Sequence, residues 1–345
     1  MSSERIRLVR GAVAGYRYGR AGAACGQRMS EFLLQLRWSG RFGNRMFQYA
    51  YGATYAKLTG LDYWMPSEWE GARLFGQQPH RVVENDEIRL ALTDPGEGAA
   101  SNERRMQAVT KHHPDAELID AELAVDPYLT PGHPVCHANG CAYNAAIFAR
   151  LSKTHLQSLC EFSEEVTRLE AYKRFFDLQG LYDVAHLRRD DIADVEYNRT
   201  HVQGYSVISK ASYARAFGKF GYSEDSIQWV SDDYTGKWHV DRGARGQGGW
   251  DYPTGSEYLP GIVFDWLHDF LKLYFARTIF RANSSFSWWA ATLSPTAKVF
   301  SPVIDKSHIY GVDGMGEIDV EFVEGNHPHW LQGGQYPKPE IVLGE

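Results

Sequence analysis

Residues 278–293, TIFRANSSFSWWAATL, decide the fold of the second half of this 345-residue chain. The stretch opens with residues 278–281, which carry Ile and Phe at their centre and predict a strand. Small polar residues follow, and then an apolar segment at 285–293 that predicts a helix. A strand, a short turn and a helix in this order make up the repeating unit of a parallel α/β sheet.

The segments around this unit repeat the same alternation. Strands are predicted at residues 182–187, 227–230 and 298–300, and helices at 212–220 and 263–276, with a glycine-rich loop at 236–261. Alternating strands and helices predict a parallel sheet with helices on both faces. The second half is therefore predicted to be α/β.

The first half starts with a predicted buried strand at 32–38, a turn at 40–44 and a helix at 46–58. Residues 80–160 are broken up by Gly, Pro, Asp and His, so that only mixed α/β structure is predicted there. A helix is predicted at 163–178. We therefore expect an appendage at 1–30, two domains at 31–179 and 180–305, and a tail at 306–345 that packs back on them.

Composition limits the classes of partner. The net charge of −7 argues against nucleic acid, which requires large basic patches. The four cysteines are irregularly spaced and are expected to be reduced thiols rather than a disulfide scaffold or a zinc site. Because no apolar run is long enough for a membrane span, a cytoplasmic protein without a transmembrane segment is predicted. The Arg-rich residues 1–30 fit either a targeting or membrane-surface arm or a chance upstream start.

Charged residues gather at the end of the strand at 182–187, where ligands of open α/β sheets bind. They are His186, Arg188, Arg189 and Asp191. Two adjacent guanidinium groups can hold a diphosphate through several hydrogen bonds. A surface cluster of Arg and Asp explains the same residues, so both interpretations stay open.

Small polar residues fill the junction between the strand and the helix at 278–293. Asn283, Ser284, Ser285 and Phe286 stand there, and backbone N–H groups at a helix start suit a phosphate oxygen. Ordinary N-capping explains them equally well.

Two acidic residues are further candidates. Asp232, after the strand at 227–230, can hold a metal or a ribose, or can simply form a turn. Asp269 lies off the apolar stripe of the helix at 263–276, where it either reaches a ligand or is solvated.

The chain resembles the α-1,2-fucosyltransferase family, glycosyltransferase family 11, and the first segment that carries the resemblance is GNRMFQYA at residues 43–50. Gly43, Asn44 and Gln48 match the family's N-terminal motif, whereas Arg45 stands where Gln is usual.

Three later segments carry the rest of the resemblance. Residues 186–191 are similar to the His-x-Arg-Arg-x-Asp motif that this family shares with α-1,6-fucosyltransferases. Residues 230–233 and 283–291 are similar to the family's third and last motifs. The four segments span most of the chain.

The resemblance implies a GT-B fold, in which two Rossmann-like domains flank a cleft. It implies that residues 31–179 face the acceptor and that residues 180–305 bind GDP-fucose, without a metal or other cofactor. The implied reaction is transfer of L-fucose, with inversion, from GDP-β-L-fucose to a hydroxyl of a glycan acceptor, the 2-OH of a galactoside.

The resemblance also implies roles for single residues. By position, Arg188 contacts the β-phosphate, Arg189 lies near the donor, and His186 helps to bind the guanine end. Asp269 stands where related enzymes keep an acid for the guanine base, and Ser285 stands at a phosphate-binding serine.

The base that accepts the hydroxyl proton is open between two carboxylates. Asp191 closes the arginine motif, and Glu196 lies ten residues after His186, the spacing at which the α-1,6 enzymes place a candidate base. Another group, or weak assistance by a base, is a third alternative.

Departures from the family leave the sugar and the acceptor open. Residues 236–261 are an unusually long glycine-rich insertion, and Gln203-Gly204 stands where the family has His-Gly. The alternatives are transfer from another GDP-hexose, such as GDP-L-galactose, and a catalytically silent carbohydrate-binding protein of the same fold.

Overall fold

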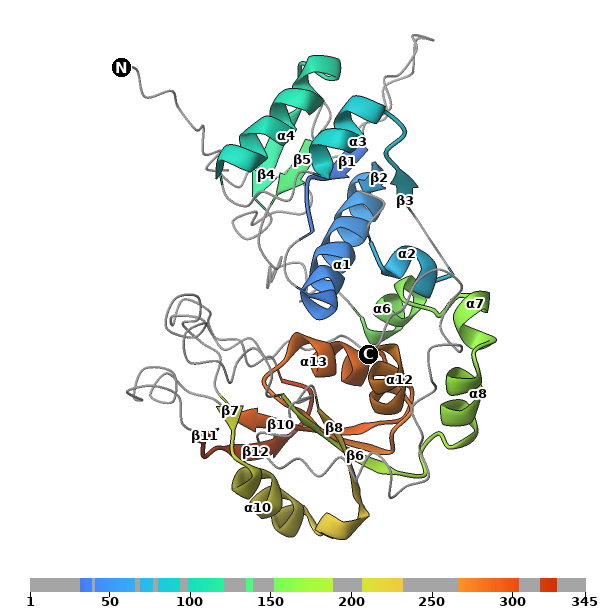
Figure 1. The fold of residues 1–345 in the computed structure, drawn as a ribbon, viewed down its shortest axis with the longest axis vertical. Coiled ribbons are helices and arrows are strands. Elements are labelled where there is room, and N and C mark those ends of the chain that lie inside the picture. Colours follow the sequence, from blue (N-terminus) through green and yellow to red (C-terminus); the bar gives the residue numbers. More distant parts are fainter. Residues whose placement is uncertain are drawn as a thin grey trace, which may run out of the picture.

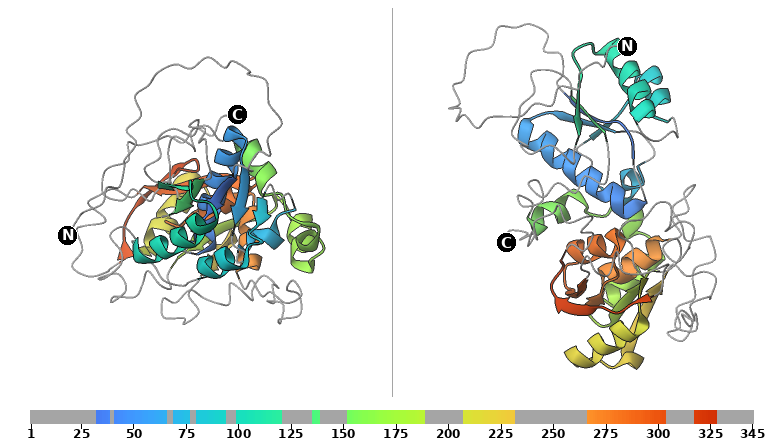
Figure 2. Two further views of the ribbon diagram at one scale, coloured as in Figure 1. Left: turned by 90° about the horizontal axis from the view of Figure 1, so that it is seen from above. Right: turned by 90° about the vertical axis from the view of Figure 1, so that its left-hand side faces the viewer.

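The computed structural model of the chain describes residues 32–38, 41–65, 69–76, 80–93, 99–120, 135–138, 152–188, 207–231, 266–303 and 317–327. They form two α/β halves, one above the other in Figure 1. Helices α1 (Phe42–Thr59) and α13 (Ser285–Leu293) lie between the two sheets, as the side view in Figure 2 also shows.

The sheet of the first half has five parallel strands in the order β3-β2-β1-β5-β4. The strands are β1 (Phe32–Gln35), β2 (Asp62–Met65), β3 (His80–Val82), β4 (Glu117–Asp120) and β5 (Val135–Ala138). The chain builds outward from β1 to β3 and then returns to the other side of β1. Such a reversal of strand order marks the place where open α/β sheets bind ligands.

The sheet of the second half has the order β12-β10-β9-β6-β8. Its parallel strands are β6 (Asp183–Leu187), β8 (Ile227–Ser231), β9 (Thr278–Phe280) and β10 (Lys298–Val303). The edge strand β12 (Glu321–Glu324) runs antiparallel to β10. Here the strand order reverses between β6 and β9, which therefore flank the expected ligand position.

The remaining elements cover the sheets or connect the halves. They are α2 (Gly71–Leu74), α3 (Asp86–Leu92), α4 (Ala99–His112), α6 (Lys153–Leu159), α7 (Glu164–Thr167), α8 (Glu170–Asp177), α10 (Lys210–Phe220), the 3-10 turn Glu224–Ser226 and α12 (Leu267–Tyr274). A separate parallel pair is formed by β7 (Val207–Ile208) and β11 (Glu317–Ile318). Two mainly parallel sheets with helical layers confirm the predicted α/β fold of the GT-B type.

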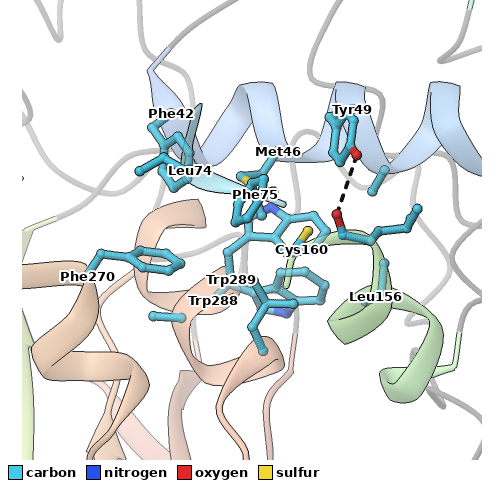
Figure 3. Close-up of a cluster of buried hydrophobic side chains, with 14 of the residues drawn as sticks. Phe42, Met46, Tyr49, Leu74, Phe75, Leu156, Cys160, Phe270, Trp288 and Trp289 are labelled. Atoms are coloured by element: carbon cyan, nitrogen blue, oxygen red, sulfur yellow. Dashed lines mark hydrogen bonds between the residues drawn. The ribbon is translucent and has the colours of Figure 1, made fainter. Parts of the chain in front are cut away.

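The largest hydrophobic cluster joins the two halves. Phe47 of α1 packs against Trp288 and Trp289 of α13, with ring centroids 4.9 Å apart in both pairs. Both indoles are almost completely buried (Figure 3). Full burial of an aromatic side chain contributes about 1.5–3 kcal/mol, so this contact stabilises each half against the other.

Helix α1 starts earlier than the sequence pattern predicts. The turn predicted at 40–44 is wrong, because the helix begins at Phe42, directly after the extended residue Arg41. Gly43 is thus helical. It was mistaken for a turn residue because glycine usually interrupts helices, whereas here it allows a close approach of α13.

The helix predicted at 163–178 is two helices. Ser163 caps α7 by accepting a hydrogen bond from the Val166 N–H at 3.3 Å, and α8 starts anew after Leu169. Helix α13, by contrast, has its predicted limits.

The predicted domain boundaries stay predictions. The appendage at 1–30 and the loop at 236–261 lie outside the described residues. Within the predicted tail, β11 pairs with β7 and β12 pairs with β10. Among the described residues, no helix combines the length and the apolar character needed to cross a lipid bilayer.

Cys160 is a free thiol that follows α6 directly and is buried in the hydrophobic cluster that joins the two halves, where it is 4% exposed. Burial raises the pKa of this thiol, so little thiolate forms near neutral pH. We expect iodoacetamide to leave Cys160 unlabelled in the native protein and to label it fully in urea, as read by peptide mass spectrometry. Rapid labelling of the native protein at Cys160 would contradict the packing.

Candidate functional site

Adjacent strands place two of the sequence motifs next to each other. β6 pairs in parallel with β9, with Ala185 opposite Phe280. The residues that follow these strands therefore meet at one edge of the sheet. His186 and Arg188 come from β6 and its end, and residues 283–286 come from the turn after β9.

His186 is held inside the fold beside Phe286. It is 4% exposed, and its ring centroid lies 5.8 Å from that of Phe286. The Tyr213 hydroxyl donates a hydrogen bond of 2.7 Å to the His186 carbonyl and so fixes the backbone. Arg188 is half-buried just beyond the end of β6.

The start of α13 is capped by a polar residue of the same segment. The Ser284 side chain accepts a hydrogen bond of 3.3 Å from the Phe286 N–H, so N-capping is one role of this segment. Asn283 and Ser284 are both buried. The capping interpretation is correct for Ser284 but leaves the hydroxyl of Ser285 for another contact.

Ser285 joins the first motif to the last. Its hydroxyl donates a hydrogen bond of 2.8 Å to Oδ1 of Asn44, at the start of α1. The two residues are 241 positions apart in the chain. Gln48, from the same first motif, is completely buried and donates to the Arg37 carbonyl at 3.5 Å, so it supports the segment after β1.

Gly43 lets the two helix starts touch. A Cβ at this position would lie 2.6 Å from the Phe286 nitrogen and 2.6 Å from the Ser285 hydroxyl oxygen. The N-terminal ends of α1 and α13 consequently face one region. The partial positive charges of both helix dipoles add there, which favours an anion.

Asp269 is buried on α12, at 8% exposure, so the alternative of a solvated position is wrong. Its carboxylate Oδ1 lies 3.9 Å from Nδ1 of His268, which is buried as well. The next residue, Phe270, packs on Phe286 with ring centroids 5.4 Å apart. Helix α12 thus lies against the same site.

A buried guanidinium that the sequence pattern did not single out follows β9. Arg281 is fully buried, and burial lowers its pKa to about 9. Its Nε donates to the Ser301 hydroxyl at 3.1 Å, and Nη2 donates to the His327 carbonyl. A charged residue at the end of the predicted strand 278–281 was the available signal, but the spacing alone could not show burial.

The remaining predicted residues, Arg189, Asp191, Glu196 and Asp232, lie outside the described residues, as do Gln203 and Gly204. Their roles stay predictions. In the described part of the chain, no group of three or more His, Cys, Asp or Glu side chains is arranged to hold a metal ion. The absence of a metal from the reaction stays a prediction too.

Among the comparisons with known proteins, matches were found with solved structures and not with family models or curated proteins. No protein-family model matches the chain, and no curated protein does. The chain is similar to fucosyltransferase NodZ from Bradyrhizobium, with 13% identity, a TM-score of 0.44, and 79% of this chain and 96% of that chain covered. It is also similar to a mutant of Arabidopsis thaliana FUT1 in complex with GDP, with 11% identity, a TM-score of 0.47, and 81% and 72% covered. For POFUT1 in complex with GDP-fucose, the identity is 14%, the TM-score 0.45, and 79% and 97% are covered.

Proposed function

We propose that the chain is an inverting glycosyltransferase that moves L-fucose from GDP-β-L-fucose to the 2-OH of a galactoside acceptor. The observation that carries the proposal is the hydrogen bond between Ser285 and Asn44, because it joins the first and last motifs of the resemblance. The His186–Phe286 contact brings the arginine motif to the same place. Three separate sequence segments thus meet at one sheet edge.

Charge supports a nucleoside diphosphate as the donor. Arg188 stands at the end of β6, and two helix N-termini converge at Gly43 and Ser285. These groups are in place before the bond between fucose and GDP breaks, so they stabilise the charge that develops on the β-phosphate. Arg189 is proposed to add a second guanidinium to this group.

The guanine and the proton complete the proposed scheme. We assign the guanine end of the donor to His186 and Asp269, with Asp232 beside the donor. A carboxylate, Asp191 or Glu196, accepts the proton of the acceptor hydroxyl as it attacks the anomeric carbon from behind. No metal takes part in the proposed reaction.

Donor profiling tests the proposal. Purified protein is incubated with GDP-fucose, GDP-L-galactose and UDP-galactose, and release of GDP or UDP is measured with and without a panel of galactosides. We expect release from GDP-fucose to exceed release from the other two donors. Turnover of GDP-L-galactose alone would replace the sugar, turnover of the UDP-sugar alone would refute the donor, and saccharide binding without any GDP affinity would favour a carbohydrate-binding protein.

Ser285 is proposed to bond a phosphate oxygen of the donor. Replacing it by alanine is therefore expected to raise the KM for GDP-fucose by roughly tenfold to a hundredfold, because a hydrogen bond to a charged group contributes about 1.5–3 kcal/mol. The matched control is Ser287→Ala. Ser287 lies on the same helix, is fully buried and bonds the Ser284 carbonyl, so its loss should leave the KM for the donor unchanged. Equal effects in both variants would show a general disturbance of α13 instead of a phosphate contact.

A further inference from the structure

A second candidate site lies beyond the carboxyl ends of β1 and β2, which are neighbouring parallel strands of the first sheet. Trp38 closes the segment that follows β1. Open α/β sheets bind ligands beyond the carboxyl ends of their strands. None of the residues assigned to the donor above occupies it.

Trp38 presents an aromatic face there. Its ring stacks on Trp69, with ring centroids 4.8 Å apart and planes 20° apart. Trp69 is buried against Phe42 and Tyr49, whereas Trp38 is half-buried. Trp69 is the only ring on which Trp38 stacks among the described residues, and part of the half-buried Trp38 side chain stays exposed at the edge of the core.

An ion pair stands beside the stacked indoles. Arg45 Nη1 donates a hydrogen bond of 2.7 Å to Oε1 of Glu70, the residue after Trp69. The two side chains are 28% and 18% exposed. The second oxygen of Glu70, Oε2, has no hydrogen-bond partner in the described part of the chain. Buried polar atoms are rarely left in this state, so the carboxylate retains accepting capacity that Arg45 does not use.

The position of this ion pair connects it to the donor side. Arg45 directly follows Asn44, which accepts the hydrogen bond from Ser285. A ligand on Trp38 and Glu70 therefore lies next to the start of α1.

We propose that Trp38, Arg45 and Glu70 form the subsite for the acceptor, and that its ligand is a neutral hexopyranoside. The apolar face of the sugar stacks on Trp38, as aromatic side chains bind flat apolar surfaces while polar groups fix orientation. A sugar hydroxyl donates to the free capacity of Glu70, and Arg45 holds that carboxylate in position. The proposal rests on the proposed function, since it names the acceptor side of the same reaction.

Matched variants separate the subsite from the general stability of the first half. Trp38→Leu keeps an apolar side chain but removes the flat ring, and Glu70→Gln removes the charge. Trp64→Leu is the control for the indole, because Trp64 is likewise half-buried and stacked, on Phe32 at 4.1 Å, but belongs to β2. Glu165→Gln is the control for the ion pair, because Glu165 pairs with Arg73 at 2.9 Å.

Saturation-transfer NMR with methyl β-galactoside, in the presence of GDP, gives the binding constant, and calorimetry gives the affinity for GDP. We expect Trp38→Leu and Glu70→Gln to weaken galactoside binding by about tenfold, equal to 1.4 kcal/mol, with the affinity for GDP unchanged. The two controls should leave both affinities unchanged.

Two results would overturn the proposed subsite. The first is a wild-type protein that binds GDP but neither methyl β-galactoside nor any other galactoside tested. The second is equal galactoside affinity in all four variants. A wild type that binds galactoside through Trp38 but lacks affinity for any GDP-sugar would leave the subsite and remove the proposed reaction. The two failures are thus distinguishable.

Discussion

Alanine in place of Gly43 is expected to abolish the proposed fucosyl transfer and to lower the free energy of unfolding by about 1–3 kcal/mol, the usual cost of overpacking. The new Cβ would come within 2.6 Å of the Phe286 nitrogen and the Ser285 hydroxyl oxygen. Because one of these atoms belongs to the backbone, the conflict cannot be relieved by rotating a side chain. The start of α13 must move, and the proposed phosphate position moves with it.

Gly218→Ala provides the control for Gly43→Ala. Gly218 is also helical, in α10, but a Cβ there would meet nothing within 4 Å. The free energy of unfolding of this variant should be higher than that of the wild type by about 0.5–1 kcal/mol, because alanine is a better helix former than glycine. Urea unfolding and calorimetry of GDP binding measure both effects. A stable Gly43→Ala protein with wild-type GDP affinity would show that the two helix starts do not form the donor site.

Arg188→Ala is expected to lower kcat by about 10²–10³, the usual cost of removing one preorganised donor to a developing charge. The side chain is half-buried at the end of β6, outside the two main hydrophobic clusters, so thermal unfolding should stay close to that of the wild type. Single-turnover measurements with saturating GDP-fucose read the chemical step directly. Arg188→Lys should recover part of the loss, since lysine keeps the charge but not the planar pair of donors.

Arg73→Ala is the matched control for Arg188→Ala. Arg73 is another partly exposed arginine, paired with Glu165 on the outside of the first half. Its replacement should leave kcat unchanged. Substantial turnover in Arg188→Ala, or equal losses in both variants, would contradict the placement of the donor phosphates.

The second half could be predicted from its sequence because apolar segments of strand and helix length alternate there and polar residues separate them. β6 is a short segment that is buried along its whole length, α13 is a longer apolar segment, and the predicted limits of α13 are correct. β10 extends past its predicted end at Phe300 and past Pro302 to Val303. Pairing with β9 stops at Phe300, but pairing with β12 on the other side continues to Val303. A proline is tolerated in a strand at such a position.

In the first half, the strand β1 and the helix α1 were predicted, but the elements after them escaped prediction because the strands there are short. β2 begins with Asp62, and β4 has acidic residues, Glu117 and Asp120, at both ends. Three or four residues do not display a period, and their strand conformation comes from pairing with a neighbour in the sheet. The pattern of the chain alone therefore gave no more than mixed α/β structure for this region.

Some features of the candidate site could likewise be predicted from the sequence, and others could not. The residue types and their order along the chain indicated the donor motifs, whereas the contact between Asn44 and Ser285 was not predicted and is known from the structure alone. The burial of Asp269 and Arg281 could not be read from spacing, because it depends on which helix covers which strand. The Arg45–Glu70 pair joins segments 25 positions apart and is likewise a product of packing.

Phe47 belongs by chain order to the first half, yet its ring lies against Trp288 and Trp289 of the second. The first half therefore cannot be replaced by that of another protein without loss of this contact, unless the new half carries side chains complementary to the two indoles. New acceptor preferences would more easily arise through single replacements on the open face of the first half, around Trp38, than through recombination of whole domains.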